Sequence, residues 1–76
     1  MYENVRVELA RQNLALIDLV ELVNRFLDED HQIRYQTLSE KLRGNSPLLL
    51  REAIAIKNAL GVDMPLEELF SVKVVS

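Results

Sequence analysis

The chain contains no cysteine and no tryptophan, and only two glycines, two prolines, two tyrosines and two phenylalanines among 76 residues. Without cysteine there is neither a disulfide framework nor a thiolate metal site, so stability has to come from packing or self-association. No apolar run approaches the ~18 residues needed to cross a bilayer, and the N-terminus lacks the basic-then-apolar order of a secretory signal. We therefore expect an intracellular, cytoplasmic protein without a membrane partner.

A basic excess is also lacking, because the net charge is −3. This balance argues against indiscriminate nucleic-acid binding. The only net-positive block is residues 32–46, with three basic residues and one acidic residue, and it follows three consecutive acids at 28–30. The 49% apolar content gives no disorder signature. Residues 1–76 are too few for two cores, so we expect one folded domain with its basic surface confined to 32–46.

Apolar residues recur at helical spacing along most of the chain. A first helix is predicted over residues 4–12, with Asn4 as its N-cap and Asn13 as a left-handed stop. Its core-facing residues are Val5 and Leu9, with Val7 as a further candidate. A second helix is predicted from Ala15 through residue 23.

The second half of the chain is punctuated by Gly44-Asn45-Ser46-Pro47. This run predicts a helix stop, an N-cap at Ser46 and a helix over residues 47–60 ended by Gly61. The buried stripe predicted for that helix is Leu50, Ala53, Ile54, Lys57 and Leu60. With a third helix within 33–44 and a fifth over 65–70, the fold class is all-α, a compact bundle of five short helices. Residues 71–76 form a tail in which 72–75 read as a short strand or a frayed end.

Residues 33–44, IRYQTLSEKLRG, resemble the recognition-helix segment of the Cro/C1 repressor-like (XRE-type) helix-turn-helix family of phages and mobile elements. Thr37-Leu38-Ser39 followed by Arg43-Gly44 carries the likeness. It extends to VRVELARQNLALIDLVELVN before and LREAIAIKNALGVDMPLEELF after, and so covers about residues 4–70. The resemblance implies a five-helix lambda repressor-like domain that binds double-stranded DNA as a homodimer and regulates transcription by occupancy, without a cofactor or a small-molecule substrate.

In such a domain one helix lies in the major groove and points its N-terminal side chains at base edges. The resemblance assigns base reading to Tyr35, Gln36 and Glu40. It assigns phosphate contacts to Arg34, Lys41, Arg43 and Asn45. Leu38 and Leu42, one turn apart, are expected to anchor the same helix in the core.

The chain departs from the family pattern in three places. Residues 25–32 are an insertion within the helix-turn-helix turn, and they either extend the second helix or form a loop. Ala15 and Leu16 stand where the family often has Thr and Gln, and Val20 stands where it has a small alanine. These departures predict an altered angle or separation between the second and third helices.

Residues 14–23 hold eight apolar residues in ten, more than one buried helix face uses. This excess predicts either a thicker core or a partner surface formed by Leu16, Ile17, Val20, Leu48 and Leu49. The alternative function is therefore a non-DNA-binding variant of the same scaffold, natural or engineered, for protein interaction or assembly into a dimer or higher homo-oligomer. An enzyme is not expected, because the four serines share only His31, and a metal is not expected, because Asp28, Glu29, Asp30 and His31 are consecutive.

Overall fold

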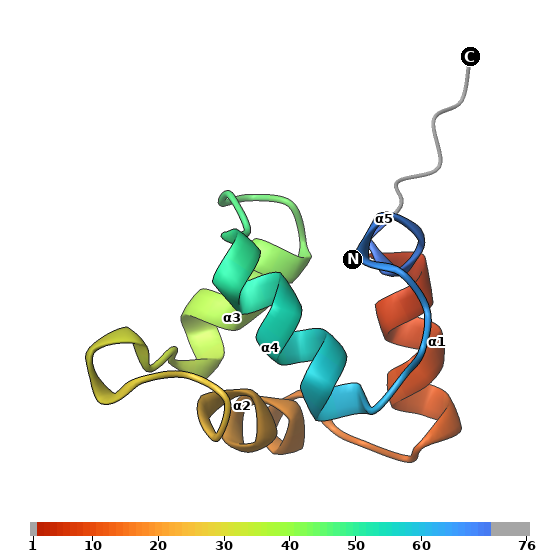
Figure 1. Ribbon diagram of the computed structural model, residues 1–76, viewed down its shortest axis with the longest axis horizontal. Coiled ribbons are helices and arrows are strands. Elements are labelled where there is room, and N and C mark those ends of the chain that lie inside the picture. Colours follow the sequence, from red (N-terminus) through yellow and green to blue (C-terminus); the bar gives the residue numbers. More distant parts are fainter. Residues whose placement is uncertain (1, 71–76) are drawn as a thin grey trace.

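A computed structural model describes residues 2–70, which form five α-helices and one 3-10 turn with no strand in that range (Figure 1). The predicted all-α class is confirmed. The predicted strand or frayed end at 72–75 lies outside the described residues. The elements in chain order are α1 (Glu3–Arg11), α2 (Leu16–Asn24), the 3-10 turn η1 (Glu29–His31), α3 (Tyr35–Leu42), α4 (Leu50–Leu60) and α5 (Leu66–Leu69).

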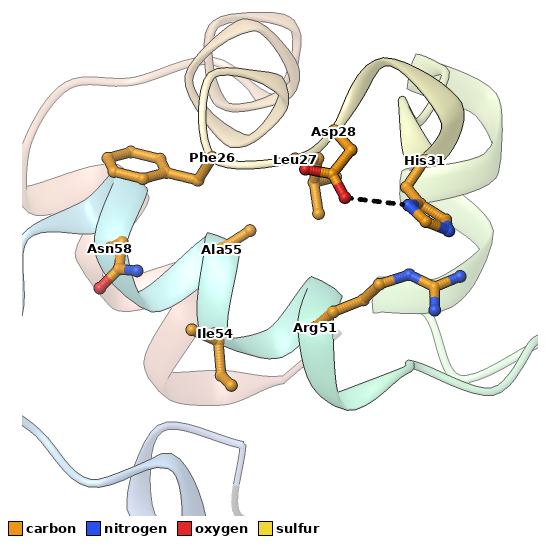
Figure 2. A pocket seen from close by; sticks show the side chains of 8 residues that line it. All are labelled: Phe26, Leu27, Asp28, His31, Arg51, Ile54, Ala55 and Asn58. Atoms are coloured by element: carbon orange, nitrogen blue, oxygen red, sulfur yellow. Dashed lines mark ion pairs between the residues drawn. The ribbon is translucent and has the colours of Figure 1, made fainter.

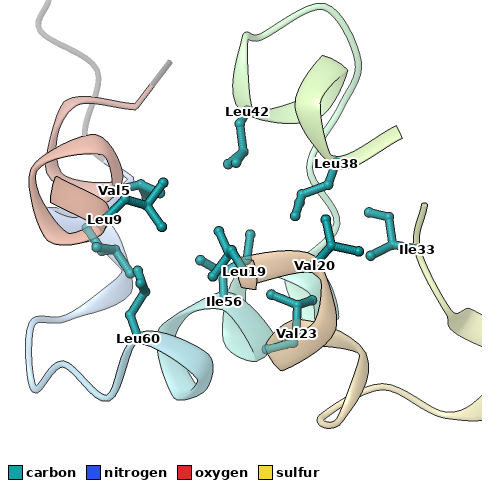
Figure 3. Packing of buried hydrophobic residues seen from close by; sticks show 12 residues of the cluster. Val5, Leu9, Leu19, Val20, Val23, Ile33, Leu38, Leu42, Ile56 and Leu60 are labelled. Atoms are coloured by element: carbon teal, nitrogen blue, oxygen red, sulfur yellow. The ribbon is translucent and has the colours of Figure 1, made fainter. Parts of the chain in front are cut away.

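One hydrophobic core joins all five helices. α2 packs mainly against α4 and also against α3, while α5 contacts both α4 and α1. Side chains from each of these elements meet in the centre (Figure 3). The fully buried ones are Leu19 and Val23 of α2, Leu38 and Leu42 of α3, and Val5, Ile56 and Leu69 of α1, α4 and α5. Leu38 and Leu42 thus anchor α3 as predicted.

The predicted helix stops are confirmed by backbone geometry. Asn13 has φ 55°, and the Leu14 and Asn13 amides donate to Leu9 and Ala10 carbonyls at 2.8 and 3.1 Å. This pair of bonds is the Schellman pattern with asparagine in the left-handed position. Gly44 (φ 85°) ends α3 and Gly61 (φ 67°) ends α4.

Two predicted helix starts are wrong. α1 begins at Glu3 with Tyr2 as its N-cap, and the Asn4 side chain instead donates to the Glu68 carbonyl at 2.7 Å, which ties α1 to α5. α4 begins at Leu50 rather than at residue 47. The reason is that the Glu52 carboxylate accepts the Leu49 amide at 2.9 Å, so the N-cap is Leu49 and not Ser46.

The outer face of α4 also differs from the predicted stripe. Leu50 is 68% exposed and Ile54 is 42% exposed, whereas Ala53 and Leu60 are buried as expected. The buried face is completed by Glu52, Ala55 and Ile56. Ala53 and Ala55 are thus buried together with the larger Ile56 and Leu60, while Leu50 and Ile54 lie on the outer face of α4. On α1, Val7 is likewise outside, at 48% exposed.

The insertion forms a loop and does not extend α2, which ends at Asn24. The Asn24 side chain fixes the C-terminal end of the loop, because its Nδ2 donates to the Ile33 carbonyl at 2.9 Å and its Oδ1 accepts from the Ile33 backbone amide at 2.8 Å. Inside the loop, Gln32 donates to the Asn24 and Leu27 carbonyls at 2.9 and 3.0 Å. Ile33 then enters the core at 6% exposed, so the connection between α2 and α3 is held at both ends.

Candidate functional site

The first turn of α3 presents a run of solvent-facing side chains. Arg34 precedes the helix in an extended conformation and Tyr35 is 48% exposed, and Gln36 and Thr37 are exposed as well. The opposite side of the same helix is buried through Leu38, Ser39 and Leu42. The helix is therefore fixed to the core by one face and offers its N-terminal polar side chains to a partner.

Glu40, Arg43 and Asn45 cluster at the other end of α3. The Asn45 Nδ2 donates to Glu40 Oε2 at 2.9 Å, and Arg43 Nη1 lies 4.0 Å from Glu40 Oε1. The Asn45 backbone amide also donates to the Glu40 carbonyl at 3.0 Å. Gln36 and Glu40 are four residues apart and so share one face of α3. The predicted base-reading residues therefore lie on the exposed part of one helix, with Glu40 already bonded to Asn45.

Lys41 is occupied by a different contact from the one predicted. Its Nζ lies 2.6 and 2.7 Å from the two carboxylate oxygens of Glu52, and the two side chains are only 14% and 8% exposed. Because the ammonium is paired and mostly covered, Lys41 joins α3 to the start of α4 and is not presented to a phosphate. No local pattern in the sequence indicates this pair, because its two members are separated by the loop after α3.

The predicted apolar partner surface is mostly used within the fold. Val20 is 7% exposed and lies in the core beside Ile33 and Leu38, so its assignment to a partner surface is wrong (Figure 3). Leu16 and Leu48 are partly buried and pack against the same core. Only Ile17, at 52% exposed, and Leu49, at 40%, remain outside. The apolar excess in 14–23 therefore serves the core more than a surface.

A pocket that the sequence did not predict lies between the α2–α3 loop and α4 (Figure 2). Its volume is about 230 Å³. At its upper right edge in Figure 2, His31 Nδ1 is 3.5 Å from Asp28 Oδ2. Sequence reasoning missed the pocket because its walls come from segments that only the fold brings together. The lining is half apolar and half polar: Phe26, Leu27, Ile54 and Ala55, with Asp28, His31, Arg51 and Asn58.

The chain matches no family model, no curated protein and no solved structure. The class that the fold defines is a small all-α domain built on one core. Among the helices of the described part, none has the length and hydrophobicity to traverse a membrane.

Proposed function

We propose that this chain is a sequence-specific DNA-binding transcriptional regulator of phage or mobile-element type that acts as a homodimer and reads DNA through α3. The observation that carries the proposal is the exposed first turn of α3, which stands on a buried opposite face. The resemblance of residues 33–44 to the Cro/C1 repressor-like recognition helix supports it. An α-helix with its side chains is ~10–12 Å across, which the ~12 Å wide major groove admits, so α3 can enter the groove with its exposed side first.

The residues assigned to DNA in and beside α3 each have a role that their chemistry permits. Gln36 makes a bidentate contact with adenine, and Tyr35 packs against a thymine methyl. Glu40 accepts from a cytosine amino group when Asn45 releases it. Arg34 and Arg43, at the two ends of the helix, contact phosphates and fix its register.

The charge pattern limits how strongly phosphates contribute. With Lys41 paired to Glu52, two arginines remain at α3 of each subunit. Four such contacts in a dimer predict a slope of log affinity against log salt of about −3.6. With so small a slope, base contacts have to supply much of the binding free energy. The acidic residues 28–30, which precede α3, further weaken binding to DNA of any sequence because they repel its phosphates.

The test is selection of duplexes from a random-sequence library, followed by fluorescence anisotropy titrations over a range of salt. Gln36→Ala should lose ~2–6 kcal/mol on the selected duplex, ~1–3 kcal/mol for each of the two subunits, and little on a random one. Arg43→Ala should weaken binding to all duplexes and reduce the magnitude of the salt slope by about 1.8, because the dimer loses two phosphate contacts. Arg6→Ala is the matched control, because Arg6 on α1 and Arg43 have nearly equal side-chain exposures of 64% and 63%. Equal effects of Arg6→Ala and Arg43→Ala would contradict the assigned interface.

The second candidate is a protein-interaction or self-assembling module that does not bind DNA. It is favoured by large apolar side chains left in solvent, above all Leu50 at 68% and Phe26 at 53% exposed. Failure to enrich any duplex, together with no binding at ~50 mM salt where phosphate contacts are strongest, would favour this candidate.

A further inference from the structure

The pocket between the α2–α3 loop and α4 has the size and character of a socket for a side chain. Its apolar lining comes from both sides, with Phe26 and Leu27 on the loop and Ile54 and Ala55 on α4 (Figure 2). A volume of about 230 Å³ is below the ~300–1,000 Å³ typical of small-molecule sites. We call these four residues the loop–α4 groove. Its dimensions favour a protruding apolar side chain over a separate ligand.

The chain itself carries such a side chain beside the groove. Leu50 begins α4 and is 68% exposed, the most exposed of the large apolar residues in the described range. It lies one turn before Ile54, on the same face of α4. A two-fold axis close to this face brings Leu50 of each copy to the groove of the other, because a two-fold interface uses the same patch on both subunits.

The groove is flanked by charges of both signs, as a self-complementary two-fold patch requires. Arg51 lies on the α4 side, and the loop side carries Asp28, Glu29 and Asp30. Within residues 2–70, Arg51, Glu29 and Asp30 take part in no ion pair. In a two-fold arrangement, the Arg51 of each copy faces the acidic loop of the other, so the pairing forms twice.

We infer that a second copy of this chain docks on the loop–α4 groove, with Leu50 of each copy inserted into the partner's groove and Arg51 set against the partner's acidic loop. This inference centres the self-association surface on Leu50 and the loop–α4 groove, and it uses neither Ile17 nor Leu49, the two predicted partner-surface residues that remain exposed. The proposed dimer forms without DNA, so its test does not depend on whether α3 recognises DNA.

The experiment is analytical ultracentrifugation of the full chain from ~1 to ~500 µM protein, a range that brackets dissociation constants of weak dimers. The wild type should show a concentration-dependent dimer. Leu50→Gln should raise the dimer dissociation constant by at least ~10-fold, as expected for a central apolar anchor. Ile17→Gln is the matched control: Ile17 is 52% exposed on α2, and its variant should dimerise like the wild type. Circular dichroism of each variant checks that the helices are intact.

A charge-reversal set tests the orientation of the two copies. Arg51→Glu should weaken the dimer, and combining it with Glu29→Lys and Asp30→Lys should restore most of the affinity. A wild type that is monomeric at every concentration overturns the inference and leaves the groove to another protein. A dimer that is insensitive to Leu50→Gln, or one that Ile17→Gln disrupts equally, also overturns it.

Discussion

At the scale of single residues, Glu8 accepts several hydrogen bonds at the end of α1 through a mostly covered carboxylate. Arg11 Nε donates to both Glu8 oxygens at 3.0 and 3.1 Å, and the Glu8 side chain is only 11% exposed. Gln12 Nε2 lies 3.3 Å from the same carboxylate and donates to the Leu60 carbonyl at 2.8 Å, so the cluster reaches the end of α4. The Arg11 hydrogen bond lowers the pKa of Glu8, and burial opposes this effect without cancelling it.

The lowered pKa makes this contact sensitive to acid. A carboxyl group whose folded pKa lies below its unfolded value of about 4.5 stabilises the fold above that value, and the contribution is lost as pH falls through the folded pKa. Urea unfolding at several pH values should therefore show wild type more stable than Glu8→Gln at pH 7. The difference should narrow below pH ~4.5. A difference that stays constant down to pH ~2.5 would mean that the Glu8 charge contributes nothing to stability.

Glu52 is predicted to be more costly to remove than Glu8, because its partner Lys41 is only 14% exposed, whereas Arg11 is 64% exposed. Its carboxylate accepts hydrogen bonds from the mostly covered Lys41 ammonium and from the Leu49 backbone amide at the start of α4. Glu52→Ala should destabilise the domain by about 3 kcal/mol, the lower end of the range for breaking a buried pair. Glu52→Gln keeps an acceptor for the Leu49 amide and should cost less. Equal losses in urea denaturation for the two variants would show that the carboxylate charge, and not the cap, is what matters.

At the scale of helices, the signals that could be read from the sequence were the ones encoded locally. Asn13, Gly44 and Gly61 end their helices as predicted because a left-handed backbone favours asparagine or glycine. The start of α4 was misplaced because its cap comes from Glu52, three residues inside the helix, and a leucine at the N-cap carries no signal of its own. The outward face of α4 depends on which side meets α2, and that is decided by packing between segments distant in sequence.

At the candidate site, too, the locally encoded features can be predicted from the sequence, and the features that depend on packing between distant segments cannot. The exposure of Gln36 follows from the helical period once Leu38 and Leu42 are placed inside. Tyr35 is three and seven residues from these leucines and shares their face by the same period, so its 48% exposure does not follow from it. The pairing of Lys41 with Glu52 and the groove beside Phe26 depend on how α3, α4 and the loop approach one another. No local pattern in the sequence specifies these approaches.

The hydrogen bonds that close the α2–α3 loop predict how the loss of Asn24 affects the loop and the start of α3. Asn24→Ala removes both hydrogen bonds to Ile33 and leaves that residue's partly buried amide and carbonyl without them. The cost should be about 2 kcal/mol, since an unsatisfied buried backbone group costs ~1–3 kcal/mol. Gln32→Ala is the control, because its bonds are exposed and should be worth well under half as much. Hydrogen exchange should show faster opening at residues 33–37 in Asn24→Ala, and unchanged exchange there would show that the loop is held by other contacts.

At the scale of the whole molecule, stability and self-association are expected to be linked because the core is small. A domain of 76 residues typically has about 4–11 kcal/mol of stability, at ~0.05–0.15 kcal/mol per residue. Leu19 is fully buried at the centre of the core, and Leu19→Ala should cost ~2–5 kcal/mol, a large share of that total.

If copies associate only when folded, dimer formation adds to the free energy of unfolding, and the melting temperature rises with protein concentration. Leu19→Ala should therefore be partly rescued at high concentration, because dimer formation still favours its folded state. Adding Leu50→Gln should remove the rescue, while adding Ile17→Gln should not, since only Leu50 belongs to the proposed interface. Thermal melts of the three variants at ~10 and ~500 µM measure this, a span that changes the dimer's contribution by about 1–2 kcal/mol. A melting temperature of Leu19→Ala that does not depend on concentration would mean that the core alone determines the stability of the molecule.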